Sequence, residues 1–198
     1  MSKKYFRPFI IVVIIFLLPY CGNSLPRIEK LTGNFSLTDQ NNNEISYPSQ
    51  YKGSIFVVSY IFTNCPDICP LSTNNMRLIK EKVENDGLKN IYFFSISFDP
   101  DNDKPEVLRK FIRARELDTK NWEFLTGSKD QTDSLMKSVG VVVIPTDTVV
   151  KPNGDIVEFY AHTDRISLYD QDLYLRKNYK GSSINVDEIV NDIKSLGD

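Results

Sequence analysis

An almost unbroken run of β-branched and aromatic residues from Ser54 to Phe62 constrains the fold more than any other feature of the sequence. A run without alternating polar positions is typical of a strand that is buried on both faces of a sheet. A second run of this kind spans Ile91 to Phe98. Between the two runs, Met76, Ile79 and Val83 recur at helical spacing. The sequence therefore predicts a buried β-α-β unit at the centre of the molecule.

Other elements are predicted on both sides of this unit. Turn-forming residues favour an N-terminal hairpin of Phe35–Leu37 with Glu44–Tyr47, and two later hairpins. The resulting element order is that of an α/β, thioredoxin-like fold with a central mixed sheet, an N-terminal hairpin extension and a hairpin inserted before His162. The remaining predicted elements are a helix over Pro105–Leu117, a strand over Trp122–Leu125, a helix over Asp130–Val139, hairpins of Asp147–Val150 with Asp155–Tyr160 and of Ile166–Tyr169 with Leu173–Tyr179, and a terminal helix after Asn185.

Residues 1–21 have the composition of an export signal. Basic residues precede an apolar run from Phe9 to Leu18, which is short for a membrane span, and Cys21 follows. A cysteine at this place resembles the lipid-attachment site of a bacterial lipoprotein, although Tyr20 is larger than the residue usual before it. We favour a lipoprotein over an uncleaved signal anchor. The expected organisation is a signal or anchor in residues 1–21, a tether in 22–33 and one extracytoplasmic, membrane-anchored domain in 34–198, on the periplasmic side.

The charge balance bears on the partners of the domain. The chain of 198 residues has a formal net charge of -2 at pH 7. A surface that binds phosphates normally shows a basic excess, so nucleic acid is not an expected partner. Outside the cytoplasm, a nearby pair of thiols is usually a disulfide, a redox couple or a site for a soft metal.

Cys65 and Cys69 are such a pair, and they lie where the first buried strand leads into a helix. Open α/β sheets place their active sites beyond the carboxyl ends of the strands. Cysteines four positions apart in a helical turn have Cα atoms about 6 Å apart, which permits a disulfide or a shared metal ion. Since the N-terminus of a helix favours thiolates, we expect both sulfurs to be more acidic than an ordinary cysteine.

The third candidate ligand is His162, which is the chain's one histidine. Thiolates together with imidazole suit copper or zinc. Two thiols and one histidine do not complete a four-ligand zinc site without a carboxylate or water. A three-coordinate copper site would need no further ligand.

Three stretches resemble the Sco/SenC family of copper chaperones. Phe62–Pro70 is similar to the family's FTxCPDICP block, Ser97–Glu106 to its SxDPxxDxPE block, and His162–Gly181 loosely to a third region. The resemblance implies that Cys65, Cys69 and His162 are ligands of one copper ion, as Cu(I) or Cu(II). It also implies that the protein delivers copper to the CuA centre of a cytochrome c oxidase subunit, or reduces the thiols of that centre, with a copper donor protein as a further partner. The family commonly has an acidic residue immediately before the histidine, where this chain has Ala161.

Other functions of the same residues remain open at this point. The main alternative is an extracytoplasmic thiol-disulfide oxidoreductase that uses Cys65 and Cys69 without a metal. A peroxidase with Thr63 and Cys65 as its active-site pair fits the pattern less well. Asp99 is expected either to approach the metal site as an acceptor or docking charge, or to cap the turn before Pro100.

Overall fold

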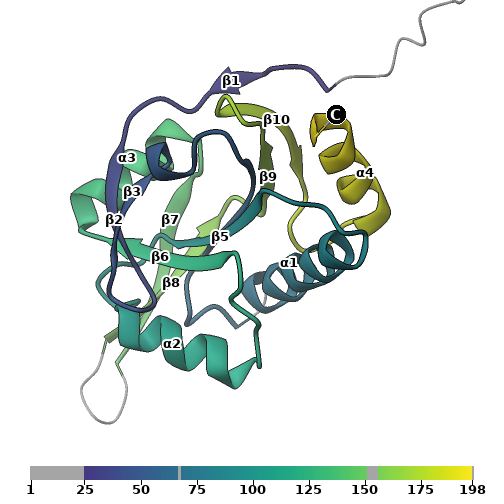
Figure 1. Cartoon of the computed structure of the whole chain (residues 1–198). Helices are drawn as coiled ribbons and strands as arrows, with labels where there is room; N and C mark the ends of the chain where they lie inside the picture. The colour runs from purple at the N-terminus through teal and green to yellow at the C-terminus, as the bar shows by residue number, and fades with distance from the viewer. Residues whose placement is uncertain (1–24, 67, 151–155, 198) are drawn as a thin grey trace, which may run out of the picture.

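The computed structural model describes residues 25–66, 68–150 and 156–197, so Cys21 and the predicted export signal lie outside the described residues. An eight-stranded mixed sheet has the order β1-β10-β9-β4-β5-β6-β2-β3, and β7 and β8 form a separate two-stranded ribbon (Figure 1). The strands are β1 (Glu29–Lys30), β2 (Phe35–Asp39), β3 (Glu44–Tyr47), β4 (Ile55–Ile61), β5 (Ile91–Ser97), β6 (Trp122–Gly127), β7 (Val143–Val150), β8 (Ile156–His162), β9 (Ile166–Tyr169) and β10 (Tyr174–Tyr179). The helices are α1 (Ile68–Asn85), α2 (Pro105–Ala114), α3 (Lys129–Ser138), α4 (Val186–Gly197) and a short 3-10 turn at Ser49–Tyr51.

The centre of the sheet consists of the parallel strands β4, β5 and β6. All seven residues of β4 are buried, as the run of apolar residues predicts. Helix α1 connects β4 to β5 and packs beside α4, as Figure 1 shows on its right side. Because β4 and β5 point the same way, the loops after both strands lie at one edge of the sheet. The CxxxC segment and the Asp99–Asp103 turn follow these two strands.

Antiparallel strands extend the sheet on both sides, and both outer hairpins are confirmed. The N-terminal hairpin, β2 with β3, joins the sheet through β6. On the other side β9 pairs with β4, and β10 pairs with β9. The predicted mixed α/β sheet with an N-terminal hairpin extension is therefore present.

The inserted hairpin is also confirmed, as the ribbon of β7 and β8. His162 is the last residue of β8 and is paired in register with Val143. The ribbon thus ends at the predicted metal site. Among the described residues, no helix combines the length and apolar character that crossing a bilayer requires.

The structure differs from the expected tether in residues 22–33. Strand β1 pairs antiparallel with β10 and so forms part of the main sheet. Arg176 donates from Nε to the Pro26 carbonyl over 3.0 Å and pairs with buried Asp170 at 2.9 Å, which fixes the segment before β1. The packed domain therefore begins before residue 34. A two-residue exposed strand has no periodic pattern, so the sequence gives no sign of it.

Candidate metal centre

The two cysteines lie at the entrance of α1. Cys69 is in the first turn of the helix and is 0% exposed, whereas Cys65 is partly buried in the loop before it. The backbone N–H of Cys69 donates to Sγ of Cys65 over 3.4 Å, which satisfies one of the N–H groups left without a partner at a helix N-terminus. The helix entrance therefore holds both sulfurs on the same side, as the CxxxC spacing predicts.

The histidine reaches this point from the β7–β8 ribbon. Nδ1 of His162 lies 3.1 Å from the carbonyl oxygen of Thr163, which can only accept, so Nδ1 is the protonated nitrogen in this contact. Thr163 is itself held by its N–H to the Val142 carbonyl over 3.0 Å. Nε2 of His162 then has a lone pair directed at Sγ of Cys69, 3.7 Å away. The Thr163 carbonyl thus orients the imidazole in a chain that has Ala161 immediately before the histidine.

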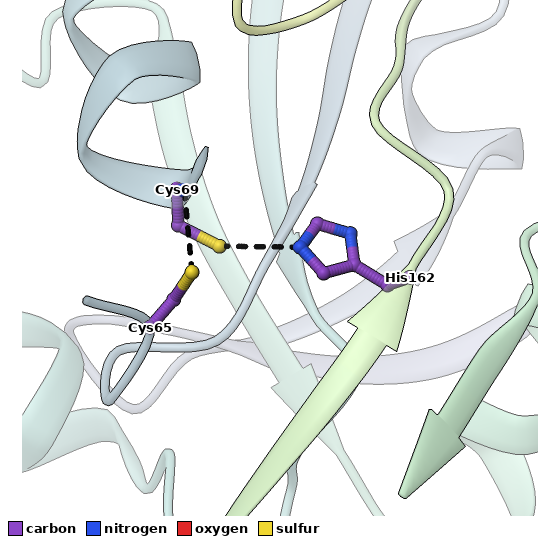
Figure 2. Close-up of side chains that lie close together, drawn as sticks. All are labelled: Cys65, Cys69 and His162. Atoms are coloured by element: carbon purple, nitrogen blue, oxygen red, sulfur yellow. Dashed lines mark hydrogen bonds between the residues drawn. The ribbon is translucent and has the colours of Figure 1, made fainter. Parts of the chain in front are cut away.

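The three side chains converge (Figure 2). The two Sγ atoms and the closest ring nitrogen all lie within 4.8 Å of one another. With metal–sulfur bonds of about 2.3 Å and metal–nitrogen bonds of about 2.0 Å, a sulfur and a nitrogen bound to one ion lie about 3.5 to 3.7 Å apart. The observed 3.7 Å between Cys69 Sγ and His162 Nε2 matches this separation. The group of Cys65, Cys69 and His162 could therefore hold a metal ion with little rearrangement.

Aromatic rings surround the histidine. The His162 ring lies 4.9 Å from the Phe98 ring and 6.1 Å from the Phe62 ring, measured between centroids. Tyr160 packs edge-on against both phenylalanines. These rings restrict the rotation of the imidazole and exclude water from one side of the site.

The predicted acidity of the cysteines is wrong for Cys69. The hydrogen-bonding Cys65 thiol, followed by burial, raises the pKa of Cys69 well above its ordinary value. These two effects on the pKa of Cys69 outweigh the opposite effect of the helix N-terminus. The backbone N–H of Cys69 donates to Sγ of Cys65. In the absence of a metal, Cys69 therefore keeps its proton at neutral pH.

Asp103 is a further residue of the site, beyond those that the sequence predicts. It is completely buried and accepts hydrogen bonds from the Thr63 N–H at 3.0 Å, from the Thr63 hydroxyl, and from the Ser97 hydroxyl at 2.6 Å. It thereby ties the loop before Cys65 to the end of β5. Because the Thr63 hydroxyl donates to Asp103 and not to Cys65, the contact counts against a peroxidase that uses Thr63 and Cys65.

Burial raises the pKa of Asp103 to about 6. Since the carboxyl binds its proton more tightly in the folded state, the stability that it contributes is fully present below about pH 4 and is lost as the pH rises through 6. We expect the free energy of unfolding of the wild type, minus that of Asp103→Asn, to fall by about 2 to 3 kcal/mol between pH 4 and 7. Urea unfolding at several pH values measures this difference, with exposed Asp101→Asn as control. An unchanged difference would show that Asp103 is already ionised at pH 4.

Asp99 stabilises the turn in which it lies, Asp99–Asp103. Its carboxylate accepts from the Asn102 amide at 3.0 Å, its carbonyl accepts from the Asp103 N–H at 2.8 Å, and burial raises its pKa. The metal-binding group found among the described residues does not include it. The contacts support the capping role that the sequence offered as one of two alternatives.

Comparisons with known proteins agree with this geometry. The SCO1/SenC family model matches residues 24–198. The crystal structure of a SCO1/SenC family lipoprotein from Bacillus anthracis has 31% identity and a TM-score of 0.71, covering 85% of this chain and 96% of that one. BsSco, described as a member of the Sco family of cytochrome c oxidase assembly proteins with a disulfide switch, has 30% identity and a TM-score of 0.70, covering 87% and 96%. Yeast Sco1 with copper bound has 26% identity and a TM-score of 0.69, covering 84% and 90%.

The family match extends over all of the described residues. It includes both cysteines, the histidine and the buried Asp103 that supports them. The chain therefore belongs to the SCO1/SenC family.

Proposed function

We propose that this protein binds one copper ion through Cys65, Cys69 and His162 and passes it to a cytochrome c oxidase subunit for the CuA centre. The observation that carries the proposal is the convergence of two sulfurs and one ring nitrogen within 4.8 Å. Two thiolates and an imidazole are ligands that copper prefers. The copper-bound yeast relative supports the choice of metal.

The number of ligands favours copper over zinc. A structural zinc site is normally closed by four protein ligands, and a catalytic one keeps a water in the fourth position. The metal-binding group found in the part of the chain that the structure describes has three members. Cu(I), a soft ion, is satisfied by two thiolates and one nitrogen.

Partial exposure of the site suits the transfer of an ion. Cys69 is buried, but Cys65 and His162 are each only partly buried. A ligand of a recipient protein can therefore approach the ion from the side of Cys65 and His162 while Cys69 still holds it. Exchange of one ligand at a time moves the ion without releasing it to water. The family resemblance and the description of BsSco support an oxidase subunit as recipient.

The proposed location is the outer face of a membrane, on the periplasmic side. Lipid attachment at Cys21 would anchor the domain, with residues 1–21 as signal and the segment after it as connection. The lipoprotein from Bacillus anthracis supports this arrangement. Mass spectrometry of the mature N-terminus tests it, because a lipoprotein begins with an acylated Cys21 and an uncleaved anchor begins at Met1.

The copper proposal is tested by titrating the reduced protein with Cu(I) and with Cu(II), followed by mixing the loaded protein with the metal-free soluble domain of an oxidase copper subunit. We expect one equivalent of copper to bind and then to appear in the CuA absorption of the recipient. A protein that binds no copper, and only exchanges disulfides with the recipient, would be an oxidoreductase.

Copper uptake should depend on pH. Because the pKa of Cys69 is raised, the ion must displace a proton from this thiol at neutral pH. We expect the apparent affinity for Cu(I) to rise about tenfold per pH unit for each proton displaced, between pH 6 and 8. Competition with a chelator of known pH dependence measures it. A flat profile would mean that Cys69 binds copper without losing a proton in this range.

A further inference from the structure

Gly181 occupies a tight space between two parts of the molecule that carry metal ligands. It is buried and follows β10, in the third region of family resemblance. A Cβ atom at this position would lie 2.7 Å from Oδ1 of Asp164, 3.3 Å from the Arg165 nitrogen and 3.3 Å from Cβ of Ser72. Only a residue without a side chain fits between them.

Hydrogen bonds fix both sides of this contact. On one side, the Asn75 amide of α1 donates to the Gly181 carbonyl over 2.8 Å. On the other, the Ser182 N–H donates to Oδ1 of Asp164 over 2.9 Å, and the Ser182 hydroxyl donates to Oδ2. The Gly181–Ser182 turn therefore joins α1 to the segment that contains Asp164.

Both sides lead directly to metal ligands. Ser72 is three residues after Cys69 on α1, and so one helical turn away. Asp164 is two residues after His162. The turn thus joins the helix that carries one ligand to the strand end that carries another, and the distance between Cys69 Sγ and His162 Nε2 is 3.7 Å.

We propose that Gly181 is a positioning residue that sets the distance between His162 and the two cysteines, and thereby the affinity for Cu(II). The inference rests on the proposed copper function. A methyl group at Gly181 would displace the Asp164 carboxylate, because real Cβ atoms essentially never approach another atom to 2.7 Å, and it would also lie close to the Arg165 backbone nitrogen and to Ser72. Since the Ser182 N–H and hydroxyl hold this carboxylate in place, we expect its displacement to shift the segment that carries His162 relative to α1.

The two oxidation states of copper separate this effect from a general loss of structure. Cu(I) is held mainly by the soft thiolates, whereas Cu(II) depends more on the imidazole nitrogen. We expect Gly181→Ala to lower the Cu(II) affinity by about 10- to 100-fold, the range found for outer-shell changes. The Cu(I) affinity should change by less than about threefold, because both cysteines remain on α1.

The experiment measures Cu(I) and Cu(II) affinities by chelator competition in Gly181→Ala, alone and combined with His162→Ala. When the histidine is absent, Gly181→Ala should add less than about a twofold effect, since it acts through that residue. Gly127→Ala is the matched control: its Cβ would lie 2.8 Å from the Leu37 side chain in β2, at the other side of the sheet. It should leave both copper affinities unchanged.

Asn75→Ala tests the same contact without adding a side chain at Gly181, because it removes the hydrogen bond to the Gly181 carbonyl. We expect it to lower the Cu(II) affinity as Gly181→Ala does. This variant replaces Gly181→Ala as the test if Gly181→Ala does not fold.

Each outcome is decisive. An unchanged Cu(II) affinity in folded Gly181→Ala would overturn the inference. It would also be overturned if Gly181→Ala lowered the Cu(I) and Cu(II) affinities equally and did the same in combination with His162→Ala. Failure of the wild type to bind copper would instead overturn the proposed function.

Discussion

Cys69→Ser lowers the affinity of the reduced protein for Cu(I) by more than about a hundredfold, because removing a ligand exceeds the 10- to 100-fold effect of losing an outer-shell partner. Serine has nearly the shape of cysteine, but its hydroxyl is a hard ligand that binds Cu(I) poorly. Cys65→Ser has an effect of the same order. The measurement is competition with a Cu(I) chelator under reducing conditions.

Cys21→Ser is the matched control for these variants. It makes the same cysteine-to-serine change outside the CxxxC segment, at the proposed site of lipid attachment, and should leave the Cu(I) affinity unchanged. Thermal unfolding without metal shows whether the serine variants remain folded. A folded Cys69→Ser protein that still binds Cu(I) with nearly the wild-type affinity would contradict a dithiolate site.

His162→Ala is expected to have its largest effect on Cu(II). The imidazole is the only nitrogen ligand in the Cys65, Cys69 and His162 group, and its Nε2 lone pair is directed at Cys69 by the Thr163 carbonyl. We expect the Cu(II) affinity to fall by more than about a hundredfold and the Cu(I) affinity by about tenfold, since the two thiolates still hold the softer ion. Chelator competition and the EPR spectrum of the Cu(II) form measure the change.

Tyr160→Phe is the control for the histidine variant. It keeps the ring that packs against Phe62 and Phe98 and removes only the hydroxyl, which donates to Glu158 at 2.6 Å. Its copper affinities should equal those of the wild type. Equal losses of Cu(II) in Tyr160→Phe and His162→Ala would show that the effect comes from repacking of the aromatic rings.

Strong local patterns explain which parts of the structure the sequence predicts. The run from Ser54 to Phe62 identifies β4 because a strand buried on both faces leaves no polar positions. The cysteine spacing places both sulfurs at one helix entrance. The chemistry of imidazole and the family resemblance indicate His162 as a ligand. That its ring lies close to the two sulfurs is visible only in the folded chain.

Contacts between distant segments explain what the sequence does not predict. Strand β1 exists because β10 offers it a partner, which no pattern near Glu29 indicates. The raised pKa of Cys69 results from the Cys65 thiol and from burial, both of which require the packed loop. Asp103 and Gly181 contact residues 40 or more positions away, so their positions relative to the cysteines are visible only in the structure.

In the proposed site, one copper ion is bound by all three side chains together. X-ray absorption spectroscopy of the copper-loaded protein counts the sulfur and nitrogen ligands, and a crystal of the same form would assign the atoms. We expect two sulfurs and one imidazole nitrogen around the metal, with Nε2 of His162 as the nitrogen. A copper ion bound by sulfurs alone, or by a nitrogen that persists in His162→Ala, would contradict it.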